Sequence, residues 1–251
     1  MTMIIAHISD LHIDTTEGGN AASVERATRV LDHLNGLPGR LDAILVTGDI
    51  ADHGLVEEYR QAAKILDSPY PVLHCPGNHD IRANYRIGLT GEPASDAPIN
   101  QVHRLPGATF ALCDSTIPGE DGGVLTGQTL DWLDGVLRDT PADTPAFVCF
   151  HHPPVRMHQP YLDSMLLTEQ ARLAEVIGRH PQVVAVLTGH AHTAAASMFA
   201  GLPLLVAPGV VSTLVMPWEH GDIVDRRQPP GIAYHVLDDE HGLTTHYRVV
   251  C

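Results

Sequence analysis

The sequence predicts an α/β fold whose first half forms a largely parallel sheet and whose second half is more antiparallel. Up to about residue 80, short apolar runs alternate with segments of helical periodicity. This β-α-β-α order is typical of parallel strands, because each helix carries the chain back across the sheet. After residue 200, apolar runs follow one another without obvious helices between them, which favours antiparallel pairing there.

Length and composition agree with one globular domain spanning residues 1–251. The chain has 44% apolar and 18% charged residues, and no internal repeat, low-complexity tract or Gly/Ser linker divides it. Its formal net charge is -15, with no Lys/Arg cluster to offset the excess of carboxylates. Such a charge disfavours nucleic-acid polymers and anionic membranes as partners and suits divalent cations better.

The four cysteines show no C-x-x-C spacing, and three of them lie inside apolar runs. We expect these thiols to be small buried hydrophobic groups. The first residues lack the basic start and apolar core of a signal peptide, and no apolar run approaches the 18 or so residues of a membrane span. The sequence therefore predicts a cytoplasmic protein.

The first half contains three predicted strands and two predicted helices. A buried strand at 3–8 is followed by a polar loop and a helix at 21–37. The second strand, 43–46, leads to a helix with one apolar face, and an apolar run at 71–75 closes this half. The residues predicted to form the apolar face of the second helix are Val56, Tyr59, Ala63 and Leu66.

The second half is less regular. Weak periodicity and repeated prolines from 81 to 101 predict a helix followed by a loop. A helix with leucines at 130, 133 and 137 on one face is expected between two strands. A long irregular stretch at about 155–168 is a candidate lid or oligomerisation segment. The remaining predicted elements are strands at 108–114, 146–150, 183–187, 202–206, 232–237 and 243–250 and a short helix at 172–179.

Five of the predicted strands end in Asp, Asn or His. One such ending is common, because Asn, Gly and Asp are ordinary turn residues. Five endings of the same kind predict a single site, since ligand crevices of α/β folds lie at the carboxyl ends of the strands. The endings are Ser9-Asp10-Leu11-His12, Thr47-Gly48-Asp49, Pro76-Gly77-Asn78-His79-Asp80, His151-His152-Pro153 and Thr188-Gly189-His190-Ala191-His192.

These endings supply carboxylate, amide and imidazole groups without a thiolate. Such a mixed set suits Mn, Fe, Zn or Co better than Ca or a structural zinc. Seven donors exceed the needs of one ion. They suit two divalent or di/trivalent ions about 3.5–4 Å apart that share a carboxylate, an arrangement used for in-line displacement at phosphorus. The candidates are Asp10, His12, Asp49, Asn78, His151, His190 and His192.

The chain resembles the calcineurin-like metallophosphoesterases. Within that superfamily it is most similar to class III cyclic-nucleotide phosphodiesterases and glycerophosphodiesterases, because of His12, the Phe150 to Pro154 motif and the stretch around Leu162 to Leu166. The resemblance implies a four-layer αββα sandwich of two mixed β-sheets flanked by helices. The matching motifs are Asp10-Leu11-His12, Gly48-Asp49, Gly77-Asn78-His79-Asp80, His151-His152 and Gly189-His190-Ala191-His192.

The resemblance also implies a role for each donor. Asp49 would bridge the two ions, and a hydroxide that they activate would attack phosphorus. His79 would bind no metal but would contact a phosphate oxygen or protonate the leaving alkoxide, so Asp49 and His79 are the candidate catalytic residues. The first ion would bind Asp10, His12 and His192, and the second Asn78, His151 and His190.

Three neighbours of these donors are expected to act differently. His152 is expected to support His151, and Asp80 to orient His79 or cap the following helix. His53 follows the second strand closely and could face the substrate, although a surface position is the simpler interpretation.

The predicted substrate is a small phosphodiester, and the subfamily resemblance favours 3′,5′- or 2′,3′-cyclic nucleotides. A phosphomonoester carries about two charges, and its sites commonly add Arg or Lys. Only Arg82 and Arg156 lie near the motifs, so a singly charged diester fits better. The alternatives are a glycerophosphodiesterase, a broad phosphomonoesterase and, more remotely, a non-catalytic binding scaffold. A nuclease would need a basic track that is missing here. The resemblance also implies a homodimer or larger homo-oligomer.

Overall fold

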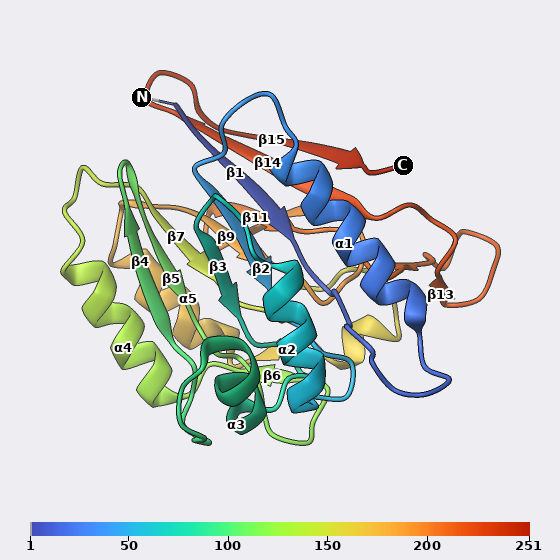
Figure 1. Ribbon diagram of the computed structural model, residues 1–251. Coiled ribbons are helices and arrows are strands. Elements are labelled where there is room, and N and C mark those ends of the chain that lie inside the picture. The colour runs from blue at the N-terminus through green and yellow to red at the C-terminus, as the bar shows by residue number, and fades with distance from the viewer. Residues whose placement is uncertain (1) are drawn as a thin grey trace.

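The computed structural model describes residues 2–251, and Met1 lies outside the described residues. Two large sheets lie face to face between helices (Figure 1). The first sheet has the strand order β15-β14-β1-β2-β3, in which β1, β2 and β3 are parallel and the two C-terminal strands are antiparallel. Its strands are β1 (Thr2–Ile8), β2 (Ala43–Thr47), β3 (Val72–Cys75), β14 (Gly231–Asp238) and β15 (Gly242–Val249).

The second sheet has the order β10-β11-β9-β7-β5-β4. Its four central strands are parallel, and each edge is closed by an antiparallel strand. Two short pairs, β6 with β8 and β12 with β13, lie outside the large sheets. The bounds are β4 (Gln101–Leu105), β5 (Ala108–Leu112), β6 (Gly123–Val124), β7 (Ala146–Cys149), β8 (Leu167–Thr168), β9 (Val183–Thr188), β10 (Ala195–Phe199), β11 (Leu202–Val206), β12 (Thr213–Leu214) and β13 (Val224–Asp225).

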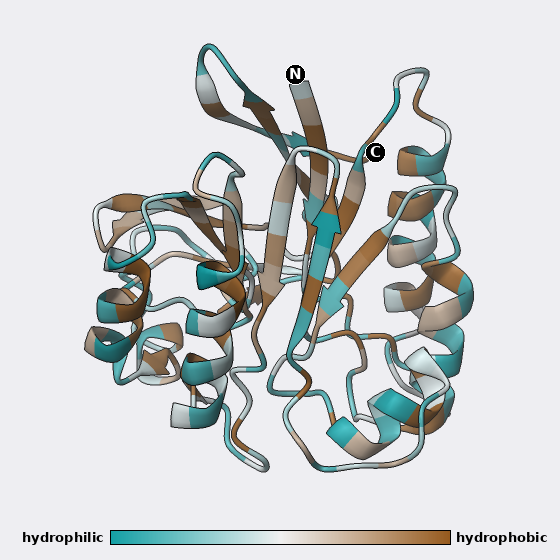
Figure 2. Cartoon of the chain, turned by 90° about the vertical axis from the view of Figure 1, so that its left-hand side faces the viewer, coloured by the Kyte–Doolittle hydropathy of each residue, from teal (hydrophilic) through white to brown (hydrophobic). Residues whose placement is uncertain are grey.

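Helices cover both outer faces of the paired sheets (Figure 2). Helices α1 and α2 pack on the first sheet, and α4 and α5 pack on the second. None of the helices in residues 2–251 is long and apolar enough to cross a bilayer. The bounds are α1 (Ala21–Asn35), α2 (Val56–Ile65), α3 (Arg82–Tyr85), α4 (Gly127–Arg138) and α5 (Gln170–Gly178), with a π-helical turn at Arg86–Thr90 and a 3₁₀ turn at Leu162–Ser164.

Side chains that alternate between the two faces of each strand produce the layers of the fold. In β2, Ala43 and Leu45 face the other sheet, whereas Ile44 and Val46 face the helices. Because successive side chains of a strand point to opposite faces, a continuous apolar run such as this one indicates burial on both sides. Three apolar cores result, one between the sheets and one under each pair of helices. The predicted four-layer αββα sandwich is confirmed, and the single domain spanning 1–251 stays a prediction.

Two edge strands were not predicted from the sequence. Strand β4 begins where a loop was expected, and β10 consists mostly of small residues with Met198 59% exposed. Edge strands that are partly exposed lack the apolar run on which the prediction depends. The apolar face of α2 also differs slightly, because Ala62 and Ile65 are buried and Ala63 is only partly buried.

Candidate metal centre

The predicted donors lie together at the carboxyl ends of β1, β2, β3, β7 and β9. The loops after β1 and β2 continue side by side, since the Asp10 N–H donates to the Gly48 carbonyl at 3.1 Å and the His12 N–H to the Asp49 carbonyl at 2.9 Å. Backbones approach closely here: a side chain at Gly77 would collide with Asp49. Glycine is therefore the residue that permits the loops to converge.

Five of the seven donors sit on left-handed backbone. Their φ angles lie between 43° and 65°, and five of the eight non-glycine residues with positive φ among residues 2–251 belong to this set. Such a conformation costs on the order of 1–3 kcal/mol for each residue and persists only where the surroundings enforce it. The backbone is therefore strained where it aims side chains into the site. The five residues are Asp10, His12, Asp49, His190 and His192.

The first group of donors contains Asp10, His12 and His192, with Asp49 beside them. The His192 Nε2 atom lies 3.3 Å from Asp10 Oδ1 and 3.2 Å from His12 Nε2. His12 Nε2 lies 3.4 Å from Asp49 Oδ2. One ligand atom from each of the four residues lies within 4.8 Å of the others, which is close enough for all four to hold one ion.

The second group contains Asn78, His151 and His190. The His151 Nε2 atom lies 3.1 Å from Asn78 Oδ1, 3.1 Å from His190 Nδ1 and 3.3 Å from Asp49 Oδ2. The same Asp49 oxygen therefore lies within 3.4 Å of a histidine nitrogen from each group.

Hydrogen bonds to the second ring nitrogen orient three of the histidines. His12 Nδ1 bonds to the Asp52 carboxylate at 2.8 Å, and His192 Nδ1 to the Ser212 hydroxyl at 2.8 Å. His151 Nδ1 donates to the Thr47 carbonyl at 2.6 Å. Such outer partners fix the ring orientation, so each Nε2 faces the site as the nitrogen that would bind a cation.

Unpaired atoms provide a test of whether the site fits metal ions. Asp10 Oδ1 and His190 Nε2 are buried without a hydrogen-bond partner in residues 2–251. A buried carboxylate oxygen without a partner is costly, and a cation would remove that cost. All donors are oxygen or nitrogen, and the cysteines at 75, 113 and 149 are buried elsewhere as free thiols. The buried clusters fit a binuclear metal site of hard or borderline cations.

The calcineurin-like phosphoesterase family matches residues 3–194 of this chain. The chain belongs to this family. A Rhodococcus erythropolis protein named "Probable cyclic nucleotide phosphodiesterase" is 33% identical over 244 residues, which are 94% of this chain and 80% of that protein. The glycerophosphodiester phosphodiesterase of Enterobacter lignolyticus is 32% identical over 233 residues, 88% of this chain and 81% of that protein. A dimetal phosphatase structure from Danio rerio covers 99% of both chains with a TM-score of 0.70 at 15% identity, which shows the fold alone.

Charges within the site of this phosphoesterase shift several pKa values. Burial opposes the charged form of His151, but Asp49 outweighs it and raises the pKa of His151 to about 9. Burial also opposes ionisation of Asp49, but His151 and His12 hold the pKa of that carboxyl well below its usual range. Burial lowers the pKa of His190 well below its usual value. A cation bound at His151 would therefore displace a proton.

His79 lies at the mouth of the site with a side chain that is 39% exposed. Its Nδ1 donates to the Asp52 carbonyl at 2.7 Å, which leaves Nε2 for a ligand. Asp80 does not orient His79 or cap the following helix, so that expectation is wrong. The Asp80 carboxylate instead accepts N–H groups from Ile50, Ala51 and Gly77, and it thereby ties the two donor loops together.

The other two neighbours differ in their surroundings. His152 is fully buried, bonds to the Ser115 hydroxyl at 2.8 Å, and has its ring 4.9 Å from that of His151 and 4.8 Å from that of His190. His53 is half exposed and bonds to Glu58 at 2.9 Å. His53 does not line the pocket described next.

A pocket of about 390 Å³ lies over the donors. Its outer wall comes from the candidate lid and from the β12–β13 region, which are joined by a hydrogen bond from the Gln159 amide to the Val215 carbonyl at 3.3 Å. The lining residues are His12, Asn20, Asp49, Asp52, Asn78, His79, Asp121, Tyr161, Leu162, Met165, His190, His192, Val211, Ser212, Leu214, Val224 and Arg226.

Several of these lining residues were not predicted from the sequence. Asp52 lies three residues after the bridging carboxylate and could have been singled out as a partner for a histidine ligand. Ser212 and Arg226 carry no local signal, because they reach the pocket only through the return of the C-terminal half to the first sheet.

Proposed function

We propose that this phosphoesterase hydrolyses small phosphodiesters with two metal ions and that cyclic nucleotides, 3′,5′ or 2′,3′, are its preferred class. The observation that carries the proposal is the placement of seven nitrogen and oxygen donors in two groups that share Asp49, at the base of an open pocket. Two ions held in this way would supply an activated water and would neutralise charge at the phosphate. The proposed ligands are the seven donors predicted from the sequence.

The chain's own residues would position the diester and handle its protons. Asn78 and His79 both line the pocket, and the backbone N–H of His79 donates to Asp49 Oδ1 at 2.9 Å. With Nδ1 donating to Asp52, the His79 ring presents Nε2 to the pocket. In its protonated form, Nε2 would donate to a phosphate oxygen or give its proton to the leaving alkoxide.

Pocket size and charge support small substrates. A volume of about 390 Å³ suits one small organic ligand. Tyr161 and Met165 add apolar surface to one wall, which suits a sugar or a base better than a bare glycerol. The net charge of -15 would repel a long polyanion. The name of the Rhodococcus relative points to the same class.

A glycerophosphodiesterase is the second candidate, because one similar relative carries that name. A broad phosphomonoesterase and a binding scaffold without activity are weaker alternatives. The complete donor set argues against the scaffold, since strained backbone at five donors has no structural purpose of its own.

Metal identity, localisation and assembly belong to the proposal as well. The donors suit Mn, Fe, Zn or Co, in divalent or mixed di/trivalent pairs. We propose a cytoplasmic protein that forms a homodimer or larger homo-oligomer, with the segment at about 155–168 as a lid or oligomerisation element.

A substrate panel tests the proposal. Metal-reconstituted protein would be assayed for kcat/KM on bis-aryl phosphate, aryl monophosphate, 3′,5′- and 2′,3′-cyclic nucleotides and glycerophosphocholine. We expect every diester that is hydrolysed to exceed the monoester and the cyclic nucleotides to exceed glycerophosphocholine. Faster turnover of the monoester than of all diesters would refute the proposal, and a preference for glycerophosphocholine would establish the second candidate.

A further inference from the structure

Among the described residues that line the pocket, Arg226 is the one lysine or arginine. The two arginines near the donor motifs in sequence, Arg82 and Arg156, do not line it. Arg82 is already engaged, because its guanidinium pairs with Asp114 at 2.7 Å and donates to the Thr116 carbonyl at 2.9 Å. Among the described lining residues, Arg226 is therefore the one side chain that carries a positive charge at any neutral pH.

The backbone of Arg226 is fixed to the rest of the site by Arg26 of α1. The Arg26 guanidinium donates to the carbonyls of Val210 at 2.7 Å, Arg226 at 3.2 Å and Gln228 at 2.5 Å. Val210 precedes the loop that carries Ser212, the partner of His192. One side chain therefore holds Arg226 against the same loop that orients a predicted metal ligand.

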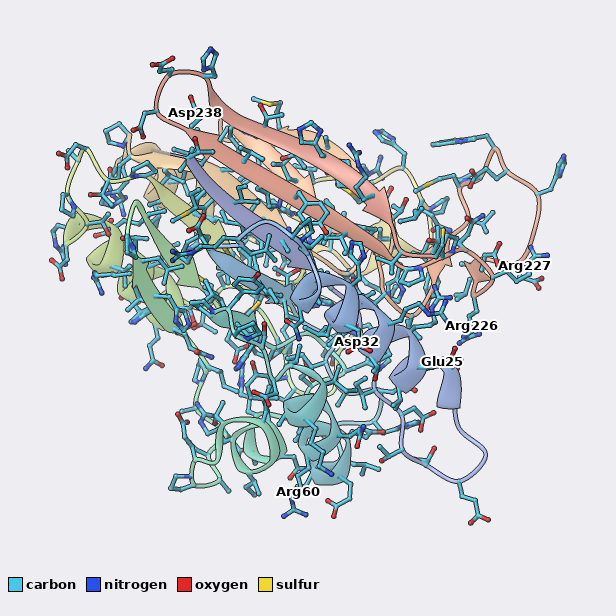
Figure 3. The ribbon with its side chains drawn as sticks, turned by 45° about the horizontal axis from the view of Figure 1, so that its top comes forward. Glu25, Asp32, Arg60, Arg226, Arg227 and Asp238 are labelled. Atoms are coloured by element: carbon cyan, nitrogen blue, oxygen red, sulfur yellow. The ribbon has the colours of Figure 1, made fainter. Side chains whose placement is uncertain are left out.

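The guanidinium of Arg226 is available, in contrast to that of its neighbour. Arg227 pairs with Asp225, with N–O distances of 3.0 and 3.2 Å, whereas no ion pair involves Arg226 in the part of the chain that the structure describes. Figure 3 shows Arg226 beside the first turns of α1, near Glu25, and Arg227 farther out on the loop. Two adjacent arginines therefore differ in both position and pairing.

We propose that Arg226 is the anion-recognition residue of this pocket and that it sets how well the pocket accepts phosphates with a second negative charge. These are phosphomonoesters and the monoester products of the enzyme's own reaction. The inference rests on the proposed function, because it places the phosphate over Asp49 and Asn78. A guanidinium fork matches phosphate oxygens, and its attraction grows with the charge that they carry.

The position of Arg226 changes the substrate range expected from the sequence. A lack of basic residues near the motifs favours diesters, but the fold brings a distant arginine to the pocket. A monoester dianion gains more from Arg226 than a diester monoanion does, since the diester has one charge fewer to pair. Arg226 thus widens the substrate range, and it retains the dianionic product of diester hydrolysis.

The test compares Arg226→Gln with Arg227→Gln as the matched control, both in metal-loaded protein. For Arg226→Gln we expect kcat/KM for aryl monophosphate to fall about tenfold, the low end of the range for one charge-assisted hydrogen bond, because Arg226 is exposed. We expect kcat/KM for bis-aryl phosphate to fall less than about threefold, and the Kd of inorganic phosphate to rise about tenfold. Arg227→Gln should change none of these values, and Arg226→Lys should restore part of the loss.

A double-mutant cycle with Arg26→Gln tests whether the hydrogen bonds from Arg26 position Arg226. Once Arg26 no longer holds the loop, the effect of Arg226→Gln on phosphate affinity should shrink. Equal losses for the monoester and the diester, equal effects of Arg226→Gln and Arg227→Gln, or unchanged phosphate affinity would each overturn the proposal. Phosphate binding does not require turnover, so failure of the wild-type protein to hydrolyse diesters would refute the proposed function while leaving this test intact.

Discussion

The two proposed metal positions differ in charge and in burial. The first has two carboxylates, Asp10 and the shared Asp49, and its histidine side chains are 9% and 14% exposed. The second has only the shared carboxylate and a neutral amide, Asn78, around the fully buried His151. The first position therefore offers more negative charge, and the second offers a more enclosed site.

The groups that hydrogen-bond the histidine ligands also differ between the two positions. At the first position, side chains hold the histidines, Asp52 at His12 and Ser212 at His192. At the second, the backbone carbonyl of Thr47 holds His151. Side-chain partners can be changed by mutation, whereas a carbonyl within a strand cannot. We infer that affinity at the first position depends on charge, and that geometry at the second depends on the fold.

The largest expected effect comes from the shared carboxylate. Asp49→Ala should lose both ions and reduce kcat/KM by at least about 10⁴-fold, as removal of one member of a catalytic group can. Asn78→Ala removes a neutral ligand from the second group alone, so it should empty mainly that position. Metal content per chain, measured after gel filtration, distinguishes the two variants. Two tightly held ions in Asp49→Ala would disprove the bridge.

The next effect concerns His79, which belongs to neither group. His79→Ala should keep both ions and lower kcat roughly 10²–10⁴-fold for alkyl esters, the range for a lost general acid. Aryl esters, whose leaving groups need no proton, should lose less. His53→Ala, which removes a half-exposed histidine outside the pocket, serves as the control. Equal losses for alkyl and aryl esters would assign His79 to phosphate positioning instead.

The fold could be predicted largely from apolar periodicity, because buried strands such as β2 carry continuous apolar runs. The donors could be predicted because each follows such a strand directly. Edge strands β4 and β10 were not predicted, since most of their residues are only partly buried and their apolar patterns are weak.

The rest of the site could not be predicted because long-range packing brings it together. Arg226 and Ser212 come from the segment between β11 and β14, far along the chain from the loops that they join. The carboxylate of Asp80 was expected to act locally. It accepts the nearby Gly77 N–H and also the N–H groups of Ile50 and Ala51 after β2, a pairing that depends on β2 and β3 lying side by side.

A smaller effect on metal binding is expected from Asp52, the hydrogen-bond partner of His12 at the first position. Asp52→Asn removes the charge that orients His12 and should weaken binding of the first ion by roughly 10- to 100-fold. The second ion should be held as before. Asp134→Asn makes the same change at a carboxylate–histidine pair remote from the site, His180 at 3.0 Å, and is the control. If a titration with a chelator showed that Asp52→Asn weakens the binding of both ions equally, Asp52 would not act on the first position alone.

The smallest expected effect concerns the stability of the fold at low pH, which depends on two buried histidines outside the metal centre. In the first sheet, His7 Nδ1 lies 3.0 Å from His235 Nε2. The other ring nitrogen of each histidine bonds to a hydroxyl, that of Thr47 for His7 and that of Thr245 for His235. No carboxylate bonds to this pair among residues 2–251. Burial lowers the pKa of His235 to about 3, and burial followed by the nearby His235 lowers that of His7 well below its usual value.

Between pH 6.5 and about 3, the unfolded chain therefore binds a proton at His235 that the folded chain does not bind, and below pH 6.5 the same difference exists at His7. The free energy of unfolding consequently falls as pH falls. The slope is about 1.4 kcal/mol per pH unit for each histidine, and it vanishes above pH 6.5. His235→Asn removes one titrating group. The Tm of the metal-free variant should consequently drop less steeply than that of metal-free wild type below pH 6.5, while the difference in Tm stays constant above it. Because the histidines of the metal centre are present in both proteins, their contribution cancels. Parallel Tm profiles across the whole range would show that His235 titrates normally in the folded protein.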